Sequence, residues 1–279
     1  MNLPADTLVV ASITRSLLNS MADWELFLVI VGAVVFCSII GLLVTRRYCK
    51  PLRDAADAGV VAGVTAIVMT LFAFVLAFGV VSLYDQFNRA TDSVAGEASD
   101  LAQLIRASRT FPKPAQERID KAVKAYILEV RNREFRLMHG GHDDLAASVL
   151  FEKIFTAVEG YEPKTQAQVA FYGSAVASLN DAVTNRRARG TEINASLPRA
   201  FGTLIILTAI VSILTTFFVT AKHRGVEVLL VSSVAIIVGA GLLTVLLLQY
   251  PFSGSVAVSS QPFVEGALRC LVLGLSCSH

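Results

Sequence analysis

Thr70, Phe74 and Phe78 recur at intervals of four within a long apolar stretch, so in a helix their side chains share one face. Ala73 and Ala77 flank that face and would let a neighbouring helix approach closely. A ring of such helices would enclose a narrow apolar constriction, and constrictions of this kind gate ion flow by dewetting. The spacing therefore predicts a pore neck at Thr70, Phe74 and Phe78. The alternative is that these aromatic rings face lipid or other helices.

Acidic residues follow the same stretch. Asp85 stands at its exit, and Glu97 and Asp100 come about three to four helical turns later. Carboxylates in such positions can line the vestibule of a pore, and we predict this role for Asp85, Glu97 and Asp100. The alternative for Glu97 and Asp100 is an acid that is solvated or faces its own domain.

Other reactive side chains do not form a recognisable site. His139 and His142 are followed by two aspartates, but a Gly-Gly turn separates the histidines and no third ligand is placed by spacing. Asp143 more simply caps the next helix. No Ser-His-Asp set, phosphate loop or dinucleotide fingerprint is visible. We predict no catalytic residue, no bound metal and no cofactor.

The composition indicates an all-α, polytopic membrane protein. Hydrophobic residues make up 54% of the chain and charged residues 16%, against about 25% charged in an average soluble domain. The apolar residues gather in four blocks, each long enough to span a bilayer. The net charge of +2 gives no reason to expect a nucleic-acid partner. The predicted spans are Leu26–Thr45, Gly59–Tyr84, Ala200–Ala221 and Val226–Leu248.

A helical domain is predicted between the second and third spans. The second span continues without a breaker through Ser108, and helices follow over Ala115–Met138, over Leu145–Val158 and from about Pro163 onward. Cys270 and Cys277, near the C-terminus, have no assigned role. The predicted organisation is a leader over 1–25, transmembrane helices over 26–84, the extramembrane domain over 85–199, transmembrane helices over 200–248, and a C-terminal segment over 249–279 that packs on the domain or the membrane interface.

Basic residues in the short loops predict the orientation. The loops after the first and third spans contain Arg46, Arg47, Lys50, Arg53, Lys222 and Arg224. The positive-inside rule places these loops in the cytoplasm, and the termini and the domain outside it, in a multi-pass protein of the cell membrane. We also expect no ionisable side chain within the spans, which counts against a proton-coupled transporter or pump.

The second span resembles a known channel segment. Phe74-Val-Leu-Ala-Phe78, followed by Val80-Val81 and Gln86-Phe87, is similar to the second-helix neck of bestrophin anion channels. The wider chain resembles the bacterial bestrophin-like membrane family over most of Gly59–Phe263. The residues that carry this likeness are Tyr84-Asp85-Gln86-Phe87, Glu97-Ala98-Ser99-Asp100-Leu101-Ala102, Tyr250-Pro251-Phe252-Ser253-Gly254 and Gln261-Pro262-Phe263.

This resemblance implies a homo-oligomeric channel in the lipid bilayer, pentameric as in bestrophins, that passes small anions. It also implies a domain in the cytosol, contrary to the orientation that the basic loops predict. A second hypothesis is a non-conducting membrane scaffold or sensor subunit whose helical domain binds a partner in a larger complex. The long continuous helices and the apolar tail Gly266–Leu275 favour this reading.

Overall fold

The computed structural model describes residues 14–16, 18–51, 57–193, 195, 197–220 and 223–274, and this part of the chain is helical with no strand. Arg53, Lys222 and Cys277 lie outside it. The chain divides into two compact units. We call residues 20–85 and 196–249 the apolar unit, and residues 1–19, 86–195 and 250–279 the polar unit.

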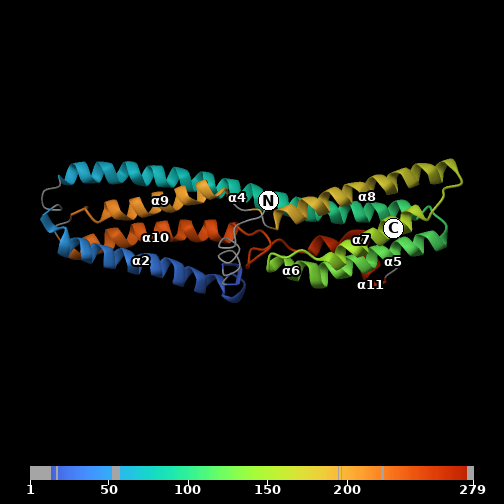
Figure 1. The fold of residues 1–279 in the computed structure, drawn as a ribbon, viewed down its shortest axis with the longest axis horizontal. Coiled ribbons are helices and arrows are strands. Elements are labelled where there is room, and N and C mark those ends of the chain that lie inside the picture. The colour runs from blue at the N-terminus through green and yellow to red at the C-terminus, as the bar shows by residue number, and fades with distance from the viewer. Residues whose placement is uncertain are drawn as a thin grey trace. The chain divides into compact units, whose positions relative to one another are not determined.

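The apolar unit contains the helices predicted to span the membrane. They are α2 (Asp23–Tyr48), the first part of α4 (Ala58–Ser108), α9 (Arg199–Thr216) and α10 (Arg224–Leu248) (Figure 1). All four are long and apolar enough to cross a bilayer, which supports the predicted count of spans. Helix α9 ends before the predicted Ala221. The backbone N–H groups of Phe217, Phe218 and Val219 bond to carbonyls three residues back, as in a 3-10 turn, and not four residues back as in an α-helix.

Small residues let the helices of this unit approach one another. Helix α2 runs alongside α10, and a Cβ placed on Gly239 would lie 3.2 Å from the backbone Cα of Val31 (Figure 1). On Gly41 a Cβ would lie 2.7 Å from the ring of Phe217. Packing of this kind holds helices together in lipid, where apolar burial alone does not.

One ionisable residue lies within the predicted fourth span, so our expectation of none is wrong. Glu227 is in the first turn of α10 and is largely buried. Its carboxylate accepts a hydrogen bond from the guanidinium of Arg46, near the end of α2. The ion pair therefore joins the ends of α2 and α10. This is a structural role and does not indicate a proton route.

The polar unit is a bundle around the second part of α4. Its other elements are α5 (Lys113–Glu129), the π-helical turn η1 (Val130–Glu134), α6 (Phe135–His139), α7 (Leu145–Glu159), α8 (Gln166–Glu192), the 3-10 turn η2 (Gln261–Val264) and α11 (Gly266–Leu273). The predicted helix over Ala115–Met138 is thus interrupted by a π turn. Helix α8 begins at Gln166 and does not run on into the third span, since it ends at Glu192 and α9 begins at Arg199.

The start of α7 corrects a predicted cap. The N-cap residue is Asp144, whose Oδ1 accepts a hydrogen bond from the backbone N–H of Ala146 at 2.9 Å. Asp143 instead accepts from the backbone N–H of Asp144. The sequence does not distinguish the two neighbouring aspartates as caps. In the structure the cap is Asp144, which directly precedes the first helical residue.

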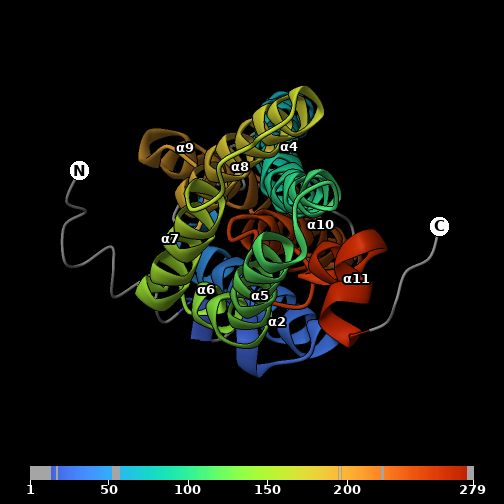
Figure 2. The same ribbon diagram turned by 90° about the vertical axis from the view of Figure 1, so that its right-hand side faces the viewer.

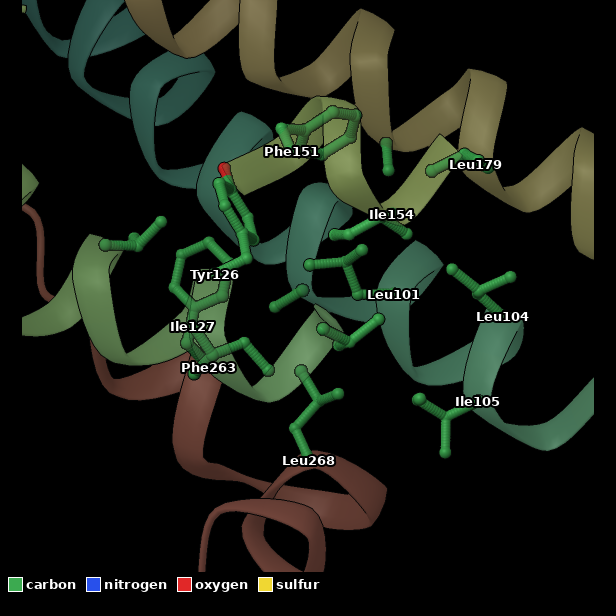
Figure 3. Close-up of a cluster of buried hydrophobic side chains, with 14 of the residues drawn as sticks. Leu101, Leu104, Ile105, Tyr126, Ile127, Phe151, Ile154, Leu179, Phe263 and Leu268 are labelled. Carbon is green, nitrogen blue, oxygen red and sulfur yellow. The ribbon is translucent and has the colours of Figure 1, made fainter. Parts of the chain in front are cut away.

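The core of the polar unit draws on segments far apart in the sequence. Leu101 and Leu104 of α4, Tyr126 and Ile127 of α5, and Ile154 of α7 lie together with Phe263 and Leu268 (Figure 3). Helix α11 lies against α5 (Figure 2). Phe263 and Leu268 of the C-terminal segment are therefore part of this core.

Candidate functional site

One face of α4 is uncovered in the apolar unit. Phe74 and Phe78 are 61% and 55% exposed, and their rings meet edge to face at 4.8 Å between centroids. Thr70 is exposed on the same face, and its hydroxyl donates to the Ala66 carbonyl at 2.8 Å. The structure therefore brings the three predicted neck residues together on one stripe.

The opposite face of the same helix is packed. Phe72, Val75 and Leu83 are each less than a tenth exposed. A Cβ on Gly79 would lie 2.9 Å from Ile205 of α9, so the two helices are in close contact there. The first part of α4 is thus packed within the apolar unit by one face, and its other face carries large exposed apolar side chains.

The three predicted vestibule acids lie in different surroundings. Asp85 is exposed at the end of the apolar stretch. Asp100 is half-buried and accepts a hydrogen bond from the side-chain amide of Asn185 at 2.8 Å. Glu97 has no exposed surface, so it cannot line a water-filled vestibule within this fold. We correct that prediction and assign Glu97 to a buried cluster.

The buried cluster joins Glu97 to two arginines. Arg189 of α8 donates from Nε to Glu97 Oε2 at 2.8 Å and from Nη2 to Glu134 Oε2 at 3.0 Å. Arg186 donates to Glu134 Oε1 at 3.2 Å. The Tyr126 hydroxyl donates to Glu97 and accepts from Arg186. Two carboxylates therefore face two guanidinium groups, and the charges balance.

Burial and pairing set the protonation states in this cluster. Burial by itself disfavours the charge of Arg189, but the carboxylates of Glu97 and Glu134 outweigh it and raise the pKa of Arg189. Burial also raises the pKa of Glu134, although Arg189 and Arg186 oppose that shift. Burial and the nearby carboxylates likewise raise the pKa of the Tyr126 hydroxyl well above its usual value, which keeps it a donor.

Sequence reasoning missed this cluster because its members are distant in the chain. Glu97 and Arg189 are 92 residues apart and Arg189 and Glu134 are 55 apart, so no periodicity connects them. One signal was available. Arg189 stands on the same face of α8 as the buried Ala182, and an arginine on the apolar side of a helix needs a buried partner.

The histidine pair does not assemble into a metal site. Across the stretches that the structure describes, no three side chains of His, Cys, Asp or Glu gather as ligands of an ion would. The main-chain carbonyl of His139 instead accepts hydrogen bonds from Asn19 and Ser253. These bonds hold the end of α6 against the two terminal segments.

Spanning helices with an uncovered aromatic stripe, attached to a helical bundle with a buried ion cluster, define a polytopic helical membrane protein. The chain belongs to the bestrophin-like family, because the profile of the bestrophin-like domain matches residues 31–263. No curated protein matches the chain.

Solved structures share the fold. A single-site variant of a bacterial bestrophin homologue from Klebsiella pneumoniae superposes with a TM-score of 0.67 at 12% identity, covering 88% of this chain and 97% of that one. A second variant of the same homologue has a TM-score of 0.66 at 12% identity, and the match covers 90% of this chain and 97% of that one. A structure described as a membrane protein variant has a TM-score of 0.65 at 12% identity, and the match covers 88% of this chain and 97% of that one. At this identity the likeness shows the fold alone.

Proposed function

We propose that this protein is a homo-oligomeric ion channel in which α4 lines the path and Thr70, Phe74 and Phe78 form its neck. The uncovered stripe of α4 carries the proposal. Copies of the chain arranged around an axis would bring these stripes together, and a ring of phenylalanines forms an apolar constriction. Membership of the bestrophin-like family supports the same reading.

The family likeness favours small anions as the permeant ions. Asp85 would lie at one mouth of the neck and Asp100 further along the same helix as vestibule residues. A ring of carboxylates favours cations, so the anion preference rests on the family and not on these residues. The measurement must therefore report selectivity as well as flux.

The test is ion flux through the purified protein in lipid vesicles. The wild type should pass small anions, and Phe74→Ala and Phe78→Ala should each raise conductance because they widen the constriction. Phe36→Ala is the matched control: Phe36 is 66% exposed on α2, so the variant removes an exposed phenylalanine from another helix. Absence of flux in the wild type and in both neck variants would refute the proposal.

The oligomeric state separates the channel from its rival. We propose a pentamer, as the bestrophin likeness suggests, and its mass in mild detergent should be five times that of the protomer. A monomer, or a stoichiometric complex with another protein, would instead support a non-conducting scaffold or sensor. The long continuous helices and the apolar tail Gly266–Leu275 motivate that second role, whereas the match to the bestrophin-like domain favours the channel.

We further propose that the basic loops face the cytoplasm and the polar unit faces the other side. Arg46, Arg47 and Arg224 lie at the ends of α2 and α10 in the apolar unit. A membrane-impermeant thiol reagent applied to intact cells should label Lys153→Cys, which is exposed on α7, but not Arg47→Cys. The reverse labelling would place the polar unit in the cytosol.

A further inference from the structure

A basic hollow lies on the polar unit beside the π turn. It has a volume of about 530 Å³. Its lining combines three basic side chains, four further hydrogen-bonding side chains and an apolar floor. The residues are Arg131, Asn132, Phe135, Arg136, His139, Gly254, Ser255, Ala257, Val258, Ser259 and Ser260. No carboxylate stands among these described residues.

The π turn is what places two arginines on one wall. Residues five apart in an α-helix point about 140° away from each other, so Arg131 and Arg136 would diverge. In a π turn the hydrogen bond runs five residues back, which stacks such residues on one face. The bond from the Phe135 N–H to the Val130 carbonyl shows this register for the residue pair directly before the two arginines. Single π turns within helices are frequent at functional sites.

The same register separates these arginines from Glu134, the acid of the turn. Glu134 points into the unit, where it pairs with Arg186 and Arg189. Arg136 donates to the Asn132 carbonyl. A guanidinium has five N–H groups, so this bond leaves others for a ligand.

The facing wall is a loop rich in serine, and it is anchored. The Ser253 hydroxyl donates to the His139 carbonyl at 2.8 Å, and the Gly254 N–H donates to Asn19 at 2.8 Å. The Ser259 hydroxyl accepts from the Gln261 N–H at 3.1 Å, which leaves its own proton to donate. The hollow therefore has two walls that are held before any ligand arrives.

The floor is buried and apolar. Phe135 is 6% exposed. Its ring meets those of Phe252 and Phe263 edge to face, with 6.1 and 6.3 Å between ring centroids. A low-dielectric floor strengthens the attraction between a bound anion and the guanidinium groups above it. Val258 is also buried here, and its N–H is bonded to the Pro251 carbonyl at 2.8 Å.

We propose that this hollow binds a tetrahedral oxyanion of the phosphate type, held by Arg131 and Arg136 with serine hydroxyls completing the shell. Guanidinium groups bind phosphate through paired N–H donors, and hydroxyls supply the remaining bonds. The ligand is either free inorganic phosphate or the phosphate of a lipid headgroup, which present the same oxygens. The proposal does not depend on conduction, because the site lies wholly within the polar unit.

The test measures binding to the full-length protein in mild detergent. Inorganic phosphate is titrated calorimetrically at low salt, and retention of phosphatidylglycerol is followed in parallel by native mass spectrometry. Arg131→Gln and Arg136→Gln should each weaken binding of the retained ligand by about tenfold, as expected for the loss of a charged hydrogen-bond donor. Arg133→Gln is the matched control, because Arg133 is in the same turn but pairs with Glu129 and Asp144.

Each outcome is decisive. Saturable phosphate binding that each of the two variants weakens identifies a free oxyanion, and lipid retention without phosphate binding identifies a headgroup. Binding that Arg133→Gln weakens as much as Arg136→Gln would reduce the site to general surface charge and overturn the proposal. So would a wild type that binds neither probe. Unchanged melting temperatures in the exposed-arginine variants exclude misfolding as the cause.

Discussion

Removing the carboxylate of Glu97 should destabilise the polar unit far more than removing a surface carboxylate. Glu97 is fully buried and accepts two hydrogen bonds from Arg189, at 2.8 and 3.4 Å. Glu97→Gln keeps the shape of the side chain but leaves the cluster with two guanidinium groups and one carboxylate. An unpaired buried charge of this kind costs about 3–5 kcal/mol.

The cost can be read as a change in melting temperature. About 1 kcal/mol shifts the midpoint by about 2–4 °C in a unit of this size, so Glu97→Gln should lower it by about 6–20 °C. The assay is thermal unfolding of the purified protein in mild detergent. Glu129→Gln is the control: it removes an exposed pair with Arg133, at 3.3 Å, that is worth about 0–1 kcal/mol.

A double variant tests the physical reason. Arg189→Met alone should also destabilise, because it leaves Glu97 buried without its main partner. In Glu97→Gln with Arg189→Met, the remaining Glu134 and Arg186 balance each other, so the combined cost should fall below the sum of the single costs by about 1–3 kcal/mol. Strictly additive costs, or a Glu97→Gln effect no larger than that of Glu129→Gln, would refute the reasoning.

Other predictions concern the same fold. Burial raises the pKa of Glu134 above its ordinary 4.5. The free energy of unfolding of the wild type, relative to that of Glu134→Gln, should therefore fall as pH rises from 4.5 through the raised pKa. Parallel pH curves in thermal unfolding would contradict this. Gly239→Leu should separate α2 from α10 and lower thermal stability. Gly32→Leu should not, because a Cβ on Gly32 would meet no other atom within 4 Å; equal effects would argue against close packing. Phe263→Ala should cost about 3–5 kcal/mol by opening a cavity in the polar core, and a cost below about 1 kcal/mol in chemical unfolding would show that the C-terminal segment does not pack there.

The sequence predicts the spanning helices well because their signal is local. Uninterrupted apolar blocks predict Leu26–Thr45 and Val226–Leu248, and the helices found are Asp23–Tyr48 and Arg224–Leu248. The stripe of Thr70, Phe74 and Phe78 is likewise a matter of helical spacing. Only its exposure needed the structure.

Features that depend on distant contacts could not be predicted in this way. The π turn at Val130–Glu134 contains no glycine or proline, so nothing local marks it, and it is associated with the pairing of Glu134 to Arg186 and Arg189 in α8. The burial of Glu97 likewise needs Arg189, which the chain brings alongside only when folded. Helical spacing cannot distinguish a buried acid from one that lines a vestibule.

The central claim, that the uncovered face of α4 lines an ion path, is tested most directly by chemical block of current. Thr70→Cys protein is recorded in planar bilayers before and after a water-soluble thiol reagent. Ser233→Cys, exposed on α10, and the wild type with its native cysteines serve as controls. The reagent should reduce the current of Thr70→Cys alone. A conducting Thr70→Cys channel that the reagent leaves unchanged, while it blocks Ser233→Cys, would contradict the claim.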